Sequence, residues 1–262
     1  MSAILVDTIP DAILNRCKPL SIDIVQAGRS VAQVYKLITK NDVFYLKVMS
    51  ERLPMSFAKE VELLTWLQGK LPVPVVTSFF KHHGQEFLLL TEVTGSNGVE
   101  QIGHLDSASI VSELARGLRR IHDLNYFGCP SDETTPAKLK RAQQNLEHGL
   151  VDESDFDLEQ LGRSAQSIYQ ELVTSAPGDD DLVFSHGDYC LPNVIFRHGQ
   201  VAGFIDMDRA GIANRYNDLA IASRSIKDNL GTEFESLFFQ RYGLENIDEK
   251  KIKYFRMLDE MF

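Results

Sequence analysis

The segment FSHGDYCLPN, at residues 184–193, places the carboxylate of Asp188 five residues before the amide of Asn193 in a turn-rich stretch. Two apolar runs follow at 194–196 and 201–205, and Asp206-Met207-Asp208 comes directly after the second run. Two strand-like runs separated by His198-Gly199-Gln200 predict a β-hairpin. The polar residues therefore flank the two ends of one hairpin.

The register of this hairpin decides how Asn193 and Asp206 face each other. With a Gly199-Gln200 turn, residue 198 pairs with residue 201 and Asn193 lands opposite Asp206. With a His198-Gly199 turn the register moves by two residues, so the two side chains still share a face. In either case we expect one carboxylate and one amide oxygen to meet at the open end of the hairpin.

Such a pair of oxygens suits a hard cation. Mg²⁺ is the best candidate, because it binds one or two protein oxygens together with waters and phosphate. Asn193 and Asp206 are therefore candidate metal ligands. Asp188 could then orient a substrate hydroxyl and accept its proton as a phosphoryl group arrives. Any one of these residues alone could be a solvated turn residue or a cap, but the three in this spacing favour phosphoryl transfer.

The rest of the chain changes character near residue 94. Before it, apolar alternation predicts strands at 21–27, 31–38, 43–49, 75–81 and 86–93, with one helix at 54–70. After Thr94-Gly95-Ser96-Asn97-Gly98 the pattern is mainly helical, first at 107–124, with a short strand at 182–185 and a helical tail from Leu219. We expect two domains, 1–94 and 95–262, with a ligand cleft between them.

The motif HGDxxxxN, followed by a hairpin and FID, resembles the catalytic and metal-binding segments of the aminoglycoside phosphotransferase family. Four further segments resemble the 3′-phosphotransferases (kanamycin kinases) of that family: WLQGKLPVP, GFIDMDRAG, RSIKDN and KIKYFRMLDEMF. The resemblance therefore covers nearly the whole chain. It implies an α+β, bilobal protein-kinase-like fold. The N-terminal lobe would be an antiparallel sheet with one helix, and the C-terminal lobe would be mainly helical. Asp188 would be catalytic, and Asn193 with Asp206 would hold Mg²⁺.

A kinase-like fold also needs a strand lysine for the nucleotide phosphates and a helix glutamate to hold that lysine. Lys47 lies in the apolar run Phe44-Tyr45-Leu46-Lys47-Val48, and Glu60 lies in the helix beyond. A lysine in such a strand needs an anionic partner, or else an edge position that leaves its amine in water. Tyr45 shares a strand face with Lys47. The resemblance implies that Tyr45 stacks on adenine, although a core tyrosine is the alternative.

The remaining nucleotide contacts rest on the resemblance. The chain has no GxGxxG loop. The family uses a short serine-containing loop instead, which makes Ser30 the candidate phosphate contact. Thr91 and Val93, after the fifth strand, would offer main-chain groups to adenine. The implied nucleotide is ATP, with GTP as the other possibility.

An aminoglycoside is a polyamine, so its site should present carboxylates. Asp157, in the acidic run 152–157, and Asp228 are candidates, although such a run is often a solvated helix start. The resemblance implies that Glu260 and the terminal carboxylate of Phe262 face the antibiotic amines.

Three other positions bear on this end of the site. Arg209 matches a family arginine beside the metal aspartate. Asp208 stands where the family usually has glycine, and Asn229 stands where relatives often have a second acid. These two departures bear on which antibiotics are accepted rather than on phosphoryl transfer itself.

Composition limits the partners. The 27 basic and 37 acidic residues give a formal charge of -10, which repels nucleic acid and anionic membranes and attracts cations. The three cysteines are odd in number and form no metal-binding pattern. The first residues lack a signal-peptide pattern, and the apolar runs are too short to cross a bilayer. We expect a cytoplasmic monomer or weak dimer with no nucleic-acid or membrane partner.

The candidate residues predict Mg²⁺-dependent phosphoryl transfer, and the resemblance implies that the ATP γ-phosphate goes to the 3′-hydroxyl of a kanamycin- or neomycin-class antibiotic, conferring resistance. Two alternatives stay open: a metabolic small-molecule kinase of the same fold and a nucleotide-binding pseudokinase. The closing LDEMF segment argues against the first. The presence of all five kinase residues argues against the second: Lys47, Glu60, Asp188, Asn193 and Asp206.

Overall fold

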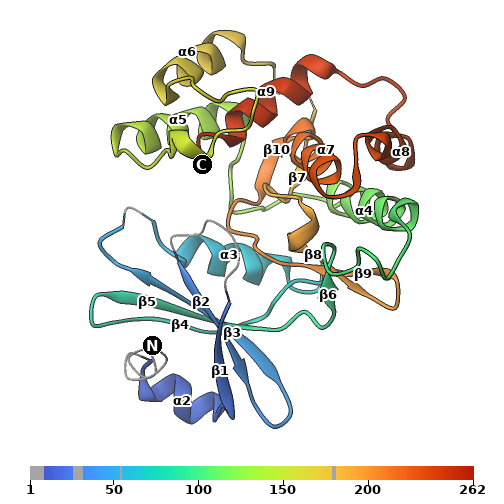
Figure 1. Cartoon of the computed structure of the whole chain (residues 1–262). Helices are drawn as coiled ribbons and strands as arrows, with labels where there is room; N and C mark the ends of the chain where they lie inside the picture. The colour runs from blue at the N-terminus through green and yellow to red at the C-terminus, as the bar shows by residue number, and fades with distance from the viewer. Residues whose placement is uncertain (1–8, 26–31, 54, 179–180) are drawn as a thin grey trace. The chain divides into compact units, whose positions relative to one another are not determined.

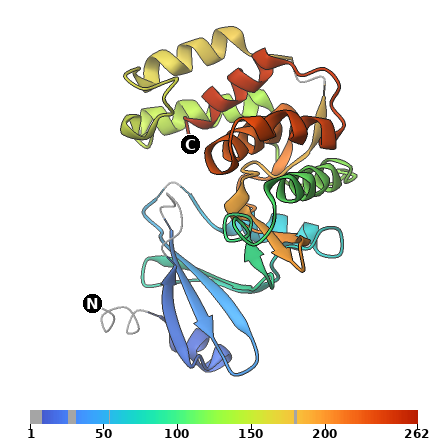
Figure 2. The same cartoon turned by 45° about the vertical axis from the view of Figure 1, so that its right-hand side comes forward.

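The computed structural model describes residues 9–25, 32–53, 55–178 and 181–262. The chain divides into two compact units, Met1–Val93 and Thr94–Phe262. We call them the N-terminal unit and the C-terminal unit (Figures 1 and 2). The division falls one residue before the boundary expected from the sequence.

The N-terminal unit is built on one antiparallel sheet with the strand order β1-β2-β3-β5-β4. Its strands are β1 (Ser21–Val25), β2 (Gln33–Ile38), β3 (Val43–Ser50), β4 (Val76–His82) and β5 (Gln85–Thr91). His83 and Gly84 join the last two strands with φ angles of 48° and 74°, as a two-residue hairpin turn requires. The antiparallel sheet predicted from the sequence is confirmed.

The two faces of this sheet are covered by different helices. Residues of α2 (Asp11–Cys17) form one core with alternate residues of the central strands: Tyr35, Leu37, Leu46, Val48, Phe87 and Leu89. The α3 helix (Ala58–Leu67) contacts the opposite face, since Glu60 meets Lys47 and the start of the helix meets Glu86. We expected α3 and missed α2, which is only 7 residues long and shows less than two turns of helical periodicity.

The C-terminal unit is mainly helical. Its helices are α4 (Ser107–His122), α5 (Thr135–Glu147), α6 (Ala165–Ser175), α7 (Tyr216–Leu230), α8 (Glu233–Tyr242) and α9 (Glu249–Asp259), with short 3₁₀ turns η1 (Glu153–Asp155) and η2 (Leu191–Asn193). The apolar stripe predicted for α4 is buried, and Asp106 caps its start by accepting from the Ser109 N–H. Among the described residues no helix combines the length and the apolar character needed to span a bilayer.

Two small sheets carry the segments singled out in the sequence. One joins β6 (Ser96–Asn97), β8 (Val194–Arg197) and β9 (Gln200–Phe204), and the other joins β7 (Leu182–Ser185) to β10 (Gly211–Asn214). The strand predicted at 182–185 is confirmed, whereas β10 was not expected.

The β8–β9 hairpin corrects the register expected from the sequence. Its turn is His198-Gly199, and Arg197 pairs with Gln200. A bulge at Ala202 then shifts the pairing by one residue, so that Val194 pairs with Phe204. Asn193 consequently lies beside Ile205, whose N–H donates to the Asn193 carbonyl at 3.0 Å. Asp206 is one residue further along, and not opposite Asn193 in the ladder.

Candidate active site

Asp188 lies in the loop between β7 and η2, where Asn193 holds its carboxylate. The side-chain amide of Asn193 donates to Oδ2 of Asp188 at 2.8 Å and to the Asp188 carbonyl at 3.0 Å. Both contacts use Nδ2, so neither of them engages the amide oxygen of Asn193. The pair thus combines an oriented carboxylate with an amide oxygen suited to a cation.

Asp206 follows β9 in the left-handed conformation, with φ of 60°. That conformation costs roughly 1 kcal/mol for a residue other than glycine, and here it turns the chain away from the strand just beyond the Ile205–Asn193 contact. A carboxylate and an amide oxygen are the kinds of ligand that Mg²⁺ takes together with waters and phosphate, so Asp206 and Asn193 would be chemically suited to hold it. Within the described part of the chain, no group of three or more His, Cys, Asp or Glu side chains forms a closed metal cage.

Gly187 shows why a glycine precedes Asp188. Its φ is +87°, and a Cβ atom placed there would lie 1.9 Å from the carbonyl oxygen of Arg209. The loop that carries Asp188 therefore passes against the backbone that follows Asp206, at a distance that only glycine permits. This contact fixes the two candidate segments relative to each other.

Asp218, in the first turn of α7, binds the backbone of the same loop. Its fully buried carboxylate accepts the N–H groups of His186 at 2.7 Å and Gly187 at 2.8 Å, and lies 2.9 Å from His122 Nε2. Burial alone would raise the pKa of Asp218, but the contacts with His122 and His186 outweigh it and lower the pKa to about 2. Burial lowers the pKa of His122, and a neutral ring with its proton on Nε2 satisfies both Asp218 and the Tyr242 hydroxyl, 2.7 Å from Nδ1.

Sequence reasoning missed Asp218. The available signal was the polar pair Asn217-Asp218 directly before the apolar run Leu219-Ala220-Ile221-Ala222. A carboxylate that starts an apolar helix face is buried and needs donors.

In the N-terminal unit the expected pairing of Lys47 with Glu60 is confirmed. Nζ of Lys47 lies 2.8 Å from Oε1 of Glu60, and the side chains are 15% and 3% exposed. Tyr45 lies two residues before Lys47 on the same face of β3, and it is half-buried rather than a core residue. The Lys36 amine lies 5.7 Å from the centroid of its ring. The face of β3 that carries Lys47 therefore also presents a partly exposed aromatic ring.

The other nucleotide candidates have mixed outcomes. Ser30 lies outside the described residues. Thr91 is the last residue of β5 rather than a residue beyond it, and its N–H donates to the Val75 carbonyl at 3.0 Å. This N–H is therefore engaged within the sheet, so the prediction of a main-chain contact with adenine now concerns the Thr91 carbonyl. Val93 lies beyond the strand and is half-buried.

At the substrate end, Arg224 of α7 joins two of the predicted carboxylates. Its Nη1 lies 3.0 Å from Asp157 Oδ2 and 3.3 Å from Glu260 Oε1, and the Asp157 N–H donates to Glu260 Oε2 at 3.1 Å. Burial, and then the charge of Asp157, raise the pKa of Glu260 to about 7. Asp228 is exposed four residues after Arg224 and takes no part in this network.

Asp259, which the sequence analysis passed over in favour of Glu260, is the center of the charge network. It accepts from Arg209 and from Arg224. Burial would raise the pKa of Asp259, but Arg209, Arg224 and Lys138 outweigh it and lower the pKa to about 2. The ring of Phe262 lies against three cations, with centroid distances of 5.2 Å to Arg209, 5.3 Å to Lys138 and 5.4 Å to Arg141.

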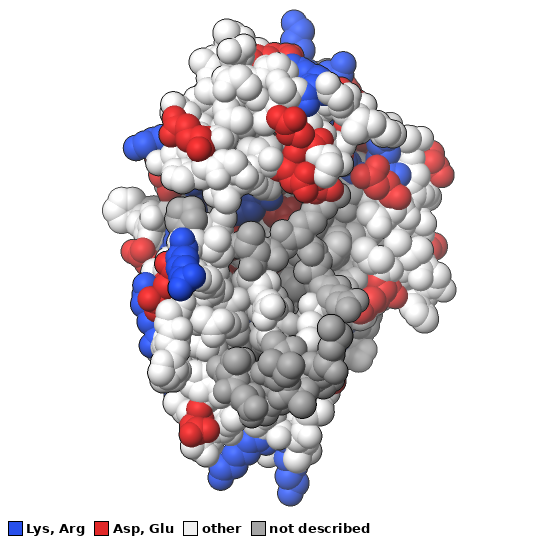
Figure 3. Space-filling view, turned by 60° about the vertical axis from the view of Figure 1, so that its left-hand side comes forward, with Lys and Arg blue, Asp and Glu red and all other residues white. Residues whose placement is uncertain are grey.

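Acidic side chains are also prominent on the surface of this unit. The segment 152–159 contains Asp152, Glu153, Asp155, Asp157 and Glu159. Figure 3 shows several acidic side chains, with a few basic ones among them, on one face of the molecule. A surface of this kind attracts polycations.

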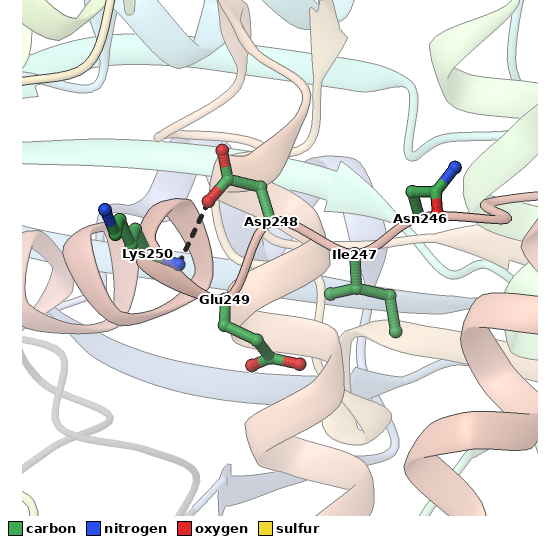
Figure 4. Close-up of a pocket in the computed structure, with 5 residues that line it drawn as sticks. All are labelled: Asn246, Ile247, Asp248, Glu249 and Lys250. Atoms are coloured by element: carbon green, nitrogen blue, oxygen red, sulfur yellow. Dashed lines mark hydrogen bonds between the residues drawn. The ribbon is translucent and has the colours of Figure 1, made fainter.

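A hollow at the start of α9 is separate from these residues. It is lined by Asn246, Ile247, Asp248, Glu249 and Lys250 (Figure 4). The Asp248 carboxylate accepts from the Lys250 N–H at 3.0 Å and from the Lys251 N–H at 3.1 Å, and so caps the helix. None of the predicted site residues lines this hollow, since Glu260 lies at the other end of α9.

The sheet with a Lys–Glu pair and the helical unit with an Asp–Asn loop define a phosphotransferase of the protein-kinase-like fold. The chain belongs to the phosphotransferase enzyme family, which it matches over residues 22–255.

Curated relatives are similar over almost their full length. The chain is 34% identical to an aminoglycoside 3′-phosphotransferase of Niallia circulans over 255 residues, covering 97% of each chain. It is 35% identical to one of Enterococcus faecalis over 242 residues, covering 90% of this chain and 91% of the relative.

Solved structures agree on the fold. An aminoglycoside-3′-phosphotransferase of type VIII aligns with a TM-score of 0.85 and 29% identity over 96% of this chain and 97% of the other. The phosphotransferase APH(3'')-Id of Streptomyces rimosus, in complex with ADP and streptomycin, aligns with a TM-score of 0.79 over 95% of each chain. At 22% identity that second likeness supports the fold alone.

Proposed function

We propose that this protein transfers the γ-phosphate of ATP to the 3′-hydroxyl of an aminoglycoside of the kanamycin or neomycin class, and thereby confers resistance. The observation that carries the proposal is the hydrogen bond from the Asn193 amide to the Asp188 carboxylate, beside the Ile205–Asn193 contact that precedes Asp206. The near full-length relatives named as aminoglycoside 3′-phosphotransferases support the choice of acceptor.

Asp188 would orient the acceptor hydroxyl and accept its proton, because its carboxylate is already held by the Asn193 amide. The Asn193 amide oxygen and the Asp206 carboxylate would hold Mg²⁺. The metal, when bound, neutralises charge on the phosphates. Asp218 and Gly187 would keep the loop in place, since one binds its N–H groups and the other permits its close approach to Arg209.

Lys47 would bind the nucleotide phosphates while Glu60 holds its amine in position. Tyr45 would stack on adenine from the same strand face, and the Thr91 carbonyl and the main chain of Val93 would contact the adenine edge. We keep Ser30 as the proposed phosphate contact. The preference between ATP and GTP is part of the test.

The acceptor is a polycation, so its amines would meet the carboxylates of Asp157, Glu260 and the chain terminus at Phe262. Arg209 would fix Asp259 next to them. Asp228, exposed near the end of α7, would make a peripheral contact at most.

The first experiment is to measure nucleoside-diphosphate release with Mg²⁺, using kanamycin A and tobramycin, which lacks the 3′-hydroxyl. We expect turnover with kanamycin A and none with tobramycin. Equal turnover would place the acceptor hydroxyl elsewhere. Inactivity with a wider panel of antibiotics, with both ATP and GTP, would favour a metabolic kinase or a pseudokinase.

Replacing the proposed catalytic carboxylate tests its role directly. We expect Asp188→Ala to reduce kcat by at least about a hundredfold, because general-base catalysis and hydroxyl orientation are lost together. ADP binding, measured by calorimetry, should stay within about twofold of the parent protein. Loss of ADP binding in the same variant would contradict the assigned role.

A further inference from the structure

The buried carboxylate of Glu86, on β5, stands outside the proposed catalytic and substrate-binding residues. Its side chain is only 2% exposed, and a charged group so deeply buried needs several donors. Three donors surround it. Ser56 Oγ lies 2.8 Å and 2.9 Å from its two oxygens, the Phe57 N–H donates at 2.8 Å, and Lys81 Nζ lies 2.9 Å away.

Two of these donors belong to the start of α3. The helix begins at Ala58 after Phe57, whose own side chain makes no cap hydrogen bond, and the Ala58 N–H donates to Ser56 Oγ at 3.2 Å. The first N–H groups of a helix need acceptors, and a negative charge at this end is favourable to the helix dipole. Glu86, on β5, supplies an acceptor and a negative charge at this end of the helix, because its carboxylate accepts the Phe57 N–H.

Glu86 and Lys47 lie on the same face of the sheet. On the β3–β5 ladder Lys47 pairs with Leu88, and Met49 pairs with Glu86. Residues two apart on a strand share a face, as do residues directly opposite each other. Lys47 contacts Glu60 and Glu86 contacts Phe57, so the sheet holds the first turn of α3 at two points three residues apart.

The charge on Glu86 is stable in this setting. Burial would raise the pKa of Glu86, but the contacts with Lys81, Phe57 and Ser56 outweigh it and lower the pKa. Lys81 itself is 58% exposed, so its ion pair is screened by water. Of the contacts of Glu86, the hydrogen bonds from Ser56 and Phe57 are the less exposed ones.

We propose that Glu86 is a positioning residue for the nucleotide: it anchors the start of α3 to the sheet and thereby sets Glu60 at the distance that holds Lys47. This inference rests on the proposed function insofar as Lys47 binds nucleotide phosphates. It assigns to β5 a role that the kinase residues recognised in the sequence do not include.

The test compares Glu86→Met with Lys81→Met in the full-length protein. Glu86→Met removes the acceptor of the α3 N–H and keeps the side chain about the same length, so we expect the ADP dissociation constant, measured by calorimetry, to rise about tenfold. Lys81→Met removes only the exposed partner, and it should leave this constant within about twofold. An unchanged constant in Glu86→Met would overturn the proposal.

A double-mutant cycle with Glu60→Ala separates positioning from general destabilisation. If Glu86 acts through Glu60, adding Glu86→Met to Glu60→Ala should change ADP binding by less than about twofold. If the two substitutions raise the ADP dissociation constant by factors that multiply in the double variant, Glu86 acts independently of Glu60 and the proposal is refuted. If Glu86→Met does not fold, Glu86→Gln replaces it in the cycle, since it keeps one acceptor oxygen and loses the charge.

Hydrogen exchange distinguishes failure of this inference from failure of the proposed function. Without nucleotide, amides of residues 57–61 should exchange faster in Glu86→Met than in Lys81→Met, because the Phe57 N–H loses its acceptor and the first turn of α3 is released. If the parent protein does not bind ADP, the proposed function fails while this measurement still tests the anchor. Equal exchange in the two variants would disprove the anchor itself.

Discussion

The carboxylates of Asp218, which is fully buried, and Asp259, whose side chain is 9% exposed, both have a pKa lowered to about 2. They hold different kinds of donor. Asp218 accepts two backbone N–H groups and faces a neutral histidine. Asp259 faces two guanidinium groups, those of Arg209 and Arg224. The first carboxylate fixes the path of the main chain, and the second fixes side chains that can move.

This difference predicts unequal consequences when each charge is lost. Backbone donors cannot turn toward water, so losing their acceptor leaves them buried and unsatisfied. The side chains of Arg209 and Arg224 are 25% and 21% exposed, and their guanidinium groups can find water or another carboxylate. Asp218 should therefore be the more costly residue to remove.

The largest effect should come from Asp218→Ala. It leaves the N–H groups of His186 and Gly187 and the Nε2 of His122 without their acceptor, so we expect the free energy of unfolding to fall by about 3–5 kcal/mol. The loop that carries Asp188 should also lose its position, lowering kcat by about a hundredfold. Urea unfolding and steady-state kinetics measure the two effects. A stability loss below that of Asp259→Asn would break the comparison.

Asp259→Asn should act mainly on substrate binding. The variant leaves two partly exposed arginines with a neutral amide in place of their shared carboxylate, so we expect a stability loss of only about 1–2 kcal/mol. Because Glu260 follows it directly at the end of α9, the aminoglycoside KM should rise about tenfold with a smaller change in kcat. Initial-rate kinetics with varied antibiotic provide the measurement. A selective fall in kcat would mean that Asp259 acts on the chemical step instead.

Acid unfolding should report both carboxylates together. Each has a pKa lowered from 3.8 to about 2, so the stability it contributes is present above pH 3.8 and is lost as the pH falls toward 2. Linkage gives on the order of 2 kcal/mol for each group. These two groups should change the urea midpoint little between pH 5 and pH 4, and should lower it between pH 4 and pH 3 more in the parent protein than in Asp259→Asn. Parallel slopes in the two proteins would show that Asp259 does not contribute.

The smallest effect should come from Glu260, the carboxyl beside Asp259 that meets only one guanidinium. Its pKa is raised to about 7, so it is neutral below that pH and charged above it. We expect the aminoglycoside KM to fall about two- to fivefold from pH 6 to pH 8, because an ionised Glu260 attracts the antibiotic amines. Glu260→Gln provides the control, since its KM should keep only the pH dependence of the antibiotic. An equal pH dependence in both proteins would remove Glu260 from the substrate site.

Local patterns in the sequence predicted most of the secondary structure that supports the site. The antiparallel sheet, the α3 and α4 helices and the strand 182–185 follow from apolar periodicity and turn residues, which depend on neighbours in the chain. The short α2 helix gave too few turns for periodicity. The Ala202 bulge was missed because a bulge changes only one pairing, and strict alternation does not reveal it.

The site was harder to predict where partners are distant in sequence. Lys47 and Glu60 are 13 residues apart and were paired correctly. Asp218 meets His122 across 96 positions, and Asp157 meets Glu260 across 103. Nothing local in Asp259-Glu260 indicates which carboxylate faces two arginines. The sequence therefore identified the chemistry near Asp188 more fully than the charges that support it.

Gly187 has a consequence for how this protein can evolve. Any change at the first or second base of a glycine codon introduces a side chain or a stop, and a side chain here would collide with the Arg209 carbonyl. Under antibiotic selection, variation should accumulate at exposed positions such as Asp228 and be purged at Gly187. Selection should therefore preserve Gly187 as well as the catalytic carboxylate, although glycine contributes no functional group, because any Cβ atom at this position would collide with the backbone.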